Sequence, residues 1–133
     1  MVRHDTVGSE NIFWSPPGGG VHYGESAPAA LAREIGEECG LIAEVGEMLF
    51  INEYIEAPLH AVEVFFHVNK ISGLLTKGVD PEFSLDSQII QEVQFMTLAE
   101  IKAFPESHVH SIFRNCESFS DLLSVRGYIV NKR

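Results

Sequence analysis

The chain has 133 residues, of which 45% are hydrophobic, and it carries a formal net charge of −10. A chain of this length can bury one substantial core, so we expect a single domain spanning residues 1–133. With only 9 Lys plus Arg, it is not expected to bind the phosphate backbone of long nucleic acids.

No uninterrupted apolar stretch approaches the length of a membrane span, and no charged and apolar leader is visible at the N-terminus. We therefore expect a cytoplasmic protein with no membrane partner. Cys39 and Cys116 are too few for a disulfide framework, and Cys39 is expected to be packed and reduced.

The first local signal along the chain is the glycine-rich turn Pro16-Pro17-Gly18-Gly19-Gly20. Glycine allows backbone to approach a ligand closely, and the carbonyls and amides of such a loop can bind a metal or a phosphate. By itself the turn is a weak signal, since most such turns only connect elements.

A helix is predicted from Ala27 to Cys39. Ser26 has the character of an N-cap, Pro28 is tolerated in the first turn, and Gly40 is a typical left-handed stop. The predicted buried stripe of this helix consists of Ala27, Ala30, Leu31 and Ile35.

Three glutamates, Glu34, Glu37 and Glu38, share one face of this helix, with Cβ atoms roughly 5–6 Å apart. At that spacing two carboxylates repel by about 3 kcal/mol at an effective dielectric of 20, so a half-buried triplet favours a hard divalent cation. The alternative is an exposed acidic face stabilised by pairing of Arg33 with Glu37. The glycine-rich turn just before the helix favours the cation site.

Residues 19–41 read GGVHYGESAPAALAREIGEECGL and fit the pattern G-x5-E-x7-R-E-U-x-E-E-x-G-U, with U aliphatic, at every fixed position. This segment resembles the Nudix box. The resemblance implies an α+β Nudix fold, an α/β/α sandwich with a mixed β-sheet between helices. It also implies a pyrophosphohydrolase that uses Mg²⁺ or Mn²⁺ and directs water onto a phosphorus of a nucleoside diphosphate linked to another group.

The substrate stays open among ADP-ribose, a nucleotide sugar and a nucleoside triphosphate. A second hypothesis is a non-catalytic nucleotide-sensing or interaction domain that retains the fold. The three helix glutamates together with Arg33 favour the enzyme, because a sensing domain has no need of all four.

The resemblance also assigns roles by position. Arg33 would orient Glu34 through an ion pair, and Glu25 would support the loop and the metal site from behind. The implied metal ligands are the carbonyl of Gly18 and the carboxylates of Glu34, Glu37 and Glu38.

The general base has more than one candidate. Glu34 is one, and the family often uses a downstream glutamate, for which Glu92 is the best match and Glu63 a weaker one. A strand at Glu92 would send Val93 and Phe95 inward and Glu92 to the opposite face. The alternative is that Glu92 simply faces solvent.

The rest of the chain predicts further strands and helices. Strands are expected at 48–56 and 61–71, with Val62 and Val64 on one face and Glu63 and Phe65 on the other. A polar loop covers 73–86. A short helix capped by Thr97 is expected to run through residue 103, a longer helix from 107 to 124, and a strand at 128–130. The histidines, His108 and His110 included, show no metal-binding spacing and are interpreted as incidental.

The N-terminus departs from the family pattern, because only 18 residues precede the box. The resemblance implies a longer lead-in, so we expect the family's first strand to be missing, with residues 2–4 as the end of the second. Three explanations stay open: a shortened chain, a misassigned start, or a homodimer whose second subunit covers the exposed edge. Arg3 is a candidate for binding a substrate phosphate, with a solvated arginine as the alternative. Phe13 and Trp14 are expected in the core, with stacking on a base as the alternative.

Overall fold

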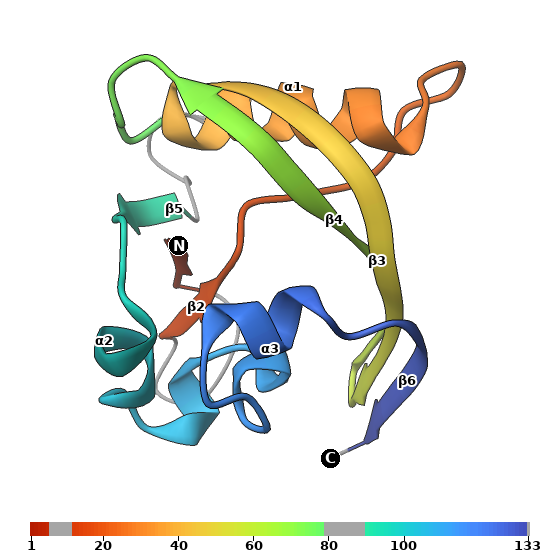
Figure 1. Ribbon diagram of the computed structural model, residues 1–133, viewed down its shortest axis with the longest axis vertical. Helices are drawn as coiled ribbons and strands as arrows, with labels where there is room; N and C mark the ends of the chain where they lie inside the picture. Colours follow the sequence, from red (N-terminus) through yellow and green to blue (C-terminus); the bar gives the residue numbers. More distant parts are fainter. Residues whose placement is uncertain (6–11, 79–89, 133) are drawn as a thin grey trace.

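The structure, a computed structural model, describes residues 1–5, 12–78 and 90–132. It contains short helical and 3-10 elements, one longer helix and six strands in this part of the chain (Figure 1). In chain order they are β1 Val2–His4, β2 Phe13–Ser15, α1 Ala27–Cys39, β3 Ile42–Glu56, β4 Leu59–Ser72, β5 Ile90–Val93, α2 Leu98–Lys102, η3 Glu106–His108, η4 Ser111–Phe113, α3 Phe119–Leu123 and β6 Gly127–Lys132.

The strands form two three-stranded sheets. One is antiparallel with the order β2-β1-β5, and the other is mixed with the order β4-β3-β6. In Figure 1, α1 lies across one end of the molecule and the shorter helical elements lie at the other. The expected α+β class with mixed strand pairing is confirmed, and the strands are divided between two sheets.

β3 and β4 form a long antiparallel hairpin: β3 begins before the predicted strand and ends at Glu56 as predicted, and β4 extends beyond the predicted strand at both ends. Their pairing runs from Ile42 opposite Ser72 to Glu56 opposite Leu59, with register shifts near Val45 and Met48. β6 pairs in parallel with the second half of β3, which confirms the strand expected at 128–130.

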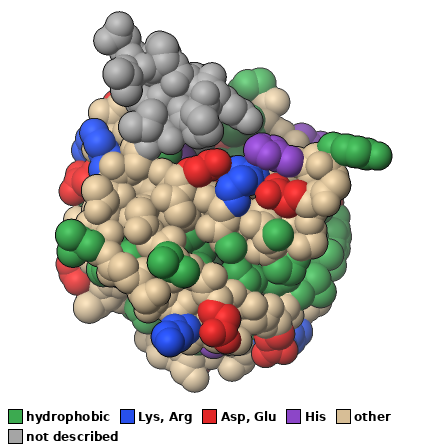
Figure 2. All heavy atoms as spheres, turned by 90° about the horizontal axis from the view of Figure 1, so that it is seen from above, with side chains coloured by type: hydrophobic (Ala, Val, Ile, Leu, Met, Phe, Trp, Pro, Cys, Tyr) green, Lys and Arg blue, Asp and Glu red, His purple; other side chains and the backbone are tan. Residues whose placement is uncertain are grey.

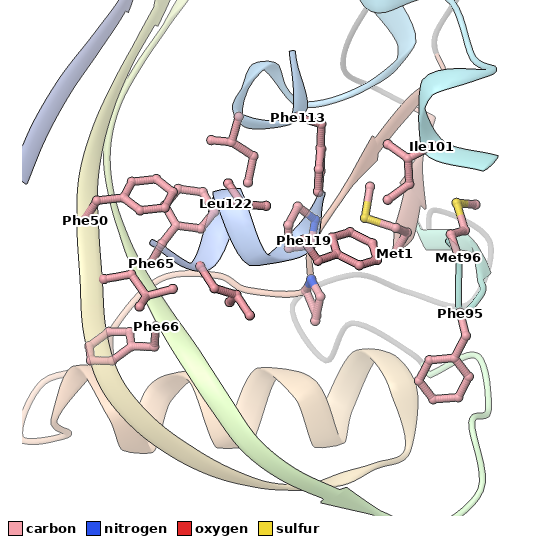
Figure 3. Close-up of a pocket in the computed structure, with 15 residues that line it drawn as sticks. Met1, Phe50, Phe65, Phe66, Phe95, Met96, Ile101, Phe113, Phe119 and Leu122 are labelled. Atoms are coloured by element: carbon pink, nitrogen blue, oxygen red, sulfur yellow. The ribbon is translucent and has the colours of Figure 1, made fainter. Parts of the chain in front are cut away.

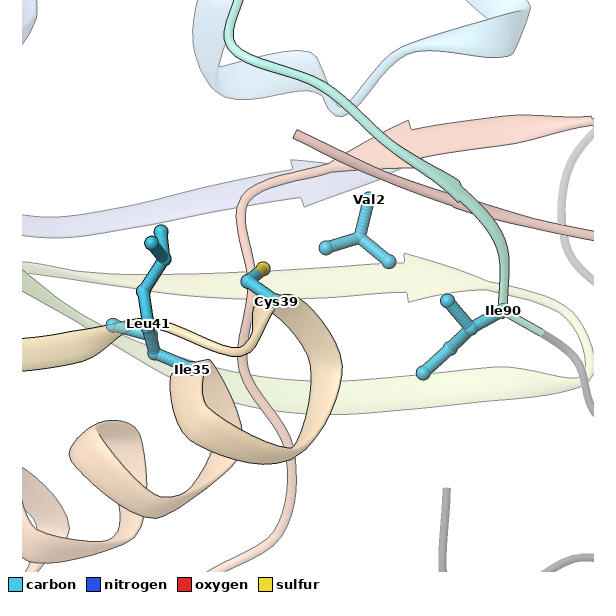
Figure 4. Close-up of a cluster of buried hydrophobic side chains, with 5 residues drawn as sticks. All are labelled: Val2, Ile35, Cys39, Leu41 and Ile90. Atoms are coloured by element: carbon cyan, nitrogen blue, oxygen red, sulfur yellow. The ribbon is translucent and has the colours of Figure 1, made fainter. Parts of the chain in front are cut away.

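α1 is fixed to the sheets by a small apolar core (Figure 4). Side chains from α1, β1, β5 and the start of β3 meet there: the buried residues are Val2, Ile35, Cys39, Leu41 and Ile90. Both cysteines are free and buried, as expected for Cys39. Burial also raises the pKa of the Cys39 thiol, so it stays protonated and inert.

A second core lies where β2 meets the helical segments after β5. Its buried members are Trp14, Ile101, Val109 and Phe113, so Trp14 is a core residue, and Phe13 is also buried. The capping box of α2 is present as predicted, with the Thr97 side chain accepting from the Glu100 amide.

The single helix predicted for residues 107–124 is wrong. The structure breaks it into η3, η4 and α3. Val109 forms a parallel bridge with Trp14, and the His110 amide donates to the Trp14 carbonyl at 3.0 Å. This pairing needs extended backbone at Val109, so a tertiary contact overrides the helical spacing of the apolar residues.

No helix in the described residues is long and apolar enough to cross a membrane.

Candidate active site

The local signals of α1 place the acidic face as predicted. The Ser26 hydroxyl accepts from the Ala29 amide at 3.3 Å, and Pro28 lies in the first turn. Gly40 ends the helix in the left-handed conformation, at φ 69°. The helix therefore begins and ends at the predicted residues, and Glu34, Glu37 and Glu38 lie on consecutive turns of one face.

Arg33 is the centre of the site. Its Nε and Nη2 donate to the two carboxylate oxygens of Glu25 at 2.9 and 3.0 Å. Its Nη1 donates to Glu34 at 3.0 Å and to Glu37 at 3.1 Å, and Nη2 also donates to the carbonyl of Gly20 at 2.9 Å. One guanidinium thus joins the glycine-rich turn, Glu25 and two helix carboxylates. On the face seen in Figure 2, acidic and basic side chains accordingly lie next to one another.

The charges of this network stabilise one another. The hydrogen bonds from Arg33, followed by that from the His22 amide, lower the pKa of Glu25 to about 2. The Glu25 carboxylate in turn raises the pKa of Arg33 above its ordinary value. Both groups are therefore ionised throughout the neutral range.

The glycine-rich turn lies directly against the helix carboxylates. The Gly18 amide donates to Glu38 Oε1 at 2.8 Å, and Glu38 is only 4% exposed. A Cβ atom at Gly19 would overlap the carboxylate of Glu34. A side chain at this position would therefore displace the Glu34 carboxylate from its present place against the turn.

The donor set fits a hard divalent cation in its chemistry, although not as a preformed cage. Within residues 1–5, 12–78 and 90–132, no three His, Cys, Asp or Glu side chains are grouped to hold a metal. Glu34 and Glu37 instead share Nη1 of Arg33. Three glutamates on one arginine nevertheless leave an excess of carboxylate oxygens, which are the ligands that Mg²⁺ prefers. A cation bound here would compete with Nη1 for Glu34 and Glu37.

The segment after β4 supports the end of α1. The Thr76 amide donates to the Cys39 carbonyl at 2.8 Å, and the Gly78 amide donates to the Glu38 carbonyl at 2.9 Å. A Cβ atom at Gly78 would overlap the Glu37 carbonyl oxygen. The sequence predicts this segment only as part of the polar loop at 73–86, and its one local signal is Gly78 itself.

Arg3 and Glu92 lie opposite each other on β1 and β5. Arg3 Nη1 is 3.8 Å from Glu92 Oε2, and the two side chains are 32% and 47% exposed. Val93 packs against the α1 core as predicted. The inward placement of Phe95 is wrong, because β5 ends at Val93 and Phe95 is 59% exposed.

A second carboxylate network joins β3 and β4 to the segment between η3 and η4. His110 Nε2 lies 2.9 and 3.1 Å from the two oxygens of Glu63, and Asn52 Nδ2 donates to Glu63 at 2.9 Å. Because the Ile112 amide donates to His110 Nδ1, the proton of the ring lies on Nε2 and is donated to Glu63. His110 is 4% exposed and Asn52 is fully buried, so the interpretation of His110 as incidental is wrong.

The pKa of Glu63 reflects two opposed effects. Burial raises it, whereas the hydrogen bonds from His110 and Asn52 and the charge of His110 together outweigh burial and leave it below its ordinary value. The sequence signal for this site was faint: Glu63 alternates with the aromatic Phe65 on the inner face of β4, where a glutamate needs a partner.

An apolar pocket of about 300 Å³ opens beside the glycine-rich turn (Figure 3). Pro16 and Pro17, the first residues of the turn, contribute to its wall. Most of the remaining lining consists of aromatic and aliphatic side chains from β3, β4 and the helical segments, among them Phe50, Phe65, Phe113, Phe119 and Leu122.

This α+β fold, in which an acidic helix follows a glycine-rich turn and shares an arginine with it, is that of a Nudix domain. The family model described as NUDIX domain matches residues 1–114, and the chain therefore belongs to the Nudix family. Membership supports a hydrolase of the Nudix type. The comparison with curated proteins gave no match.

Proposed function

We propose that the protein is a pyrophosphohydrolase that cleaves the diphosphate bond of a nucleoside diphosphate linked to another group, with Mg²⁺ or Mn²⁺ as its cofactor. The candidate substrates are ADP-ribose, a nucleotide sugar and a nucleoside triphosphate. All are small molecules, which agrees with a chain whose net charge of −10 disfavours long nucleic acids.

The observation that carries this proposal is the Arg33 network. Glu25 holds Arg33 from one side, while Arg33 holds Glu34 and Glu37 from the other. Glu38 is buried against the Gly18 amide of the turn. An ordinary solvated helix face has no need to bury a glutamate or to bring a glycine backbone against a carboxylate.

We assign the metal-binding role to Glu34, Glu37, Glu38 and the carbonyl of Gly18. A bound divalent ion would neutralise the phosphates and lower the pKa of the attacking water. The chain's own contribution is positioning, because Arg33 and Glu25 fix the direction of Glu34. The glycine residues of the turn would let the substrate phosphates approach the helix closely.

Glu34 is our first candidate for the group that takes the proton from the water, because it lies inside the network. Glu92 is the second candidate. Its salt bridge to Arg3 places a basic group beside it, and Arg3 is our candidate for holding a substrate phosphate.

We assign the nucleoside part of the substrate to the apolar pocket. The pocket shares Pro16 and Pro17 with the glycine-rich turn, so a ligand in it can extend its phosphates toward α1. Its aromatic lining suits stacking on a flat ring.

The proposal is tested by incubating the chain with the candidate substrates and Mg²⁺ or Mn²⁺ and identifying the phosphate-containing products. We expect Glu38→Gln to lower turnover at least about 10³-fold without loss of folding, because it removes a charge that acts in the transition state. Glu117→Gln, at an exposed glutamate outside the site, is the control and should leave turnover unchanged.

Two outcomes would contradict the proposal. Unchanged hydrolysis in Glu38→Gln would remove this residue from the mechanism. Tight nucleotide binding without turnover under any condition would instead identify the second candidate, a nucleotide-sensing domain that retains the fold.

A further inference from the structure

A cavity of about 210 Å³ lies among the helical segments that follow β5, and the proposed hydrolysis does not use it. We call it the second cavity. None of the residues that line it belongs to the Arg33 network. They come from α2, η3, η4 and the chain next to these elements: Ile101, Lys102, Phe104, Glu106, Val109, His110, Phe113 and Arg114.

One part of the second cavity has an apolar wall. Val109 and Phe113 are each 6% exposed, and Ile101 is 3% exposed. Phe104 is half-buried, and the centroid of its ring lies 5.6 Å from that of Trp14. A molecule that fills this part of the cavity therefore needs an apolar body.

Two basic side chains, Lys102 and Arg114, line the same cavity. The whole chain has 9 Lys plus Arg against 19 Asp plus Glu, so a pair of basic residues at one cavity runs against the charge of the chain. The Lys102 ammonium donates to the Cys116 carbonyl, and because an ammonium has three donors it can also bind a ligand. Glu106 is the acidic residue of the lining, and its side chain is 81% exposed.

The guanidinium of Arg114 has an edge that lacks a carboxylate at hydrogen-bond distance. In Arg33 the corresponding edge, Nε and Nη2, donates to both oxygens of Glu25 at 2.9 and 3.0 Å. Arg114 Nε is buried and has no hydrogen-bond partner among the described residues, and Glu106 Oε2 lies 3.9 Å from it. Arg114 Nη2 donates to the Glu106 carbonyl at the long distance of 3.5 Å. A buried donor is normally satisfied by a protein group, a water or a ligand.

We propose that the second cavity binds a small organic carboxylate with an apolar body. The carboxylate pairs with Nε and Nη2 of Arg114, because its two oxygens match the planar fork of a guanidinium. Lys102 adds a second positive charge, and the body lies against Phe104 and Val109. A contact between Arg114 and Glu106 at such exposure is weak, so the ligand can replace it.

The volume of the second cavity limits the size of the ligand. At about 210 Å³ it is below the range of about 300–1,000 Å³ that drug-sized ligands occupy, so the apolar body is about the size of a single ring.

The second cavity shares two lining residues with the apolar pocket, Ile101 and Phe113, and both are labelled in Figure 3. A ligand bound in the second cavity therefore contacts side chains that also line the pocket assigned to the nucleoside. Binding of the carboxylate needs no turnover, so it can be measured whether or not the chain hydrolyses a diphosphate.

The test is a titration of the isotope-labelled chain with sodium benzoate, followed by two-dimensional NMR. We expect shifts at the residues of the second cavity, Ile101 and Phe113 included, and a dissociation constant on the order of 1 mM. Benzamide has the same shape without the charge and should bind at least about tenfold more weakly. Inorganic phosphate, which has no apolar body, should also bind more weakly than benzoate.

Arg114→Gln removes the guanidinium and should raise the dissociation constant for benzoate at least about tenfold. Arg126→Gln is the matched control, because Arg126 pairs with Glu47 at an exposed place outside the second cavity, and it should leave this constant unchanged. Circular dichroism establishes that each variant is folded. The comparison of benzoate with benzamide uses the parent chain and does not depend on either variant.

Several results would overturn the proposal. One is the absence of shifts at the second cavity at the highest benzoate concentration. Others are equal binding of benzamide, tighter binding of phosphate than of benzoate, and an unchanged affinity for benzoate in folded Arg114→Gln. An equal loss of affinity in Arg126→Gln would overturn it as well.

Discussion

Two carboxylate networks among the described residues differ in the group that holds them together: an arginine in one and a glutamate in the other. Around Arg33, a permanently charged group holds Glu25, Glu34 and Glu37, and these side chains are 15–28% exposed. Around Glu63, an imidazole and an amide donate to one carboxylate, and His110 is only 4% exposed. The first network carries excess negative charge, with three carboxylates on one arginine, whereas in the second a single carboxylate, itself 31% exposed, accepts from the buried donors His110 and Asn52.

This difference indicates which network can bind a metal ion or a substrate and take part in catalysis. A group of carboxylates with excess negative charge can exchange an arginine contact for a metal ion or a substrate. A single carboxylate held by two buried donors stabilises one arrangement of the chain instead. We therefore expect substitutions in the first network to affect turnover and those in the second to affect stability.

The largest expected effect is on turnover when Arg33 is replaced. Arg33→Gln leaves Glu25, Glu34 and Glu37 without their common donor, and we expect a loss of about 10³-fold in kcat/KM, or about 4 kcal/mol in transition-state stabilisation. The measurement is steady-state hydrolysis of the substrate found in the screen. Arg126→Gln, at an exposed surface pair with Glu47, is the control and should change kcat/KM less than twofold. A normal rate in Arg33→Gln would show that the network is structural.

The next effect separates a buried histidine–glutamate pair from an exposed one. His110→Ala empties space beside Phe65 and leaves the Glu63 carboxylate without its main donor, so we expect a loss of about 3 kcal/mol in the free energy of unfolding. His60→Ala breaks the pair with Glu53 at a histidine that is 59% exposed and should cost less than about 0.5 kcal/mol. Urea denaturation, at a concentration where all proteins are monomeric, measures both. Equal losses would contradict the distinction between the two pairs.

The smallest effect is on the pH dependence of stability. The pKa of Glu63 is lowered from its ordinary value of 4.5, so its contribution is complete above pH 4.5 and is lost as pH falls through the folded value. Glu63→Gln lacks this contribution. We therefore expect the difference in unfolding free energy between the parent and Glu63→Gln to shrink from about pH 6 to about pH 3.5. A difference that is constant across this range would show that ionised Glu63 gains nothing from folding. Glu47→Gln at the surface provides the control series.

The parts of the site that sequence analysis predicted are those encoded locally. The bounds of α1 follow from Ser26 and Gly40, and the spacing of Glu34, Glu37 and Glu38 within one helix places them together. The pairing of Arg33 with Glu34 and Glu37 is equally local. Membership of the Nudix family and the α+β class were also predicted and are confirmed.

The parts that were not predicted depend on contacts between distant residues. Glu63 and His110 are 47 residues apart, and neither has a local sequence feature that identifies the other as its partner. The bridge of Val109 to Trp14 breaks the predicted helix at a point where the apolar spacing is still helical. The support of α1 by Gly78 likewise arises from the path of the chain after β4. In each case the partner residue lies on another element of the fold. The periodicity of apolar residues within one segment does not predict such a contact.

The parallel pairing of β6 with β3 has a consequence for synthesis of the chain. Phe50 lies opposite Gly127, and 127 − 50 gives a separation of 77 residues. While the ribosome is still translating the intervening segment, one edge of β3 has hydrogen-bonding groups with no strand beside them. The second half of β3 therefore gains its parallel neighbour only after β6, near the end of the chain, has been synthesised and has docked.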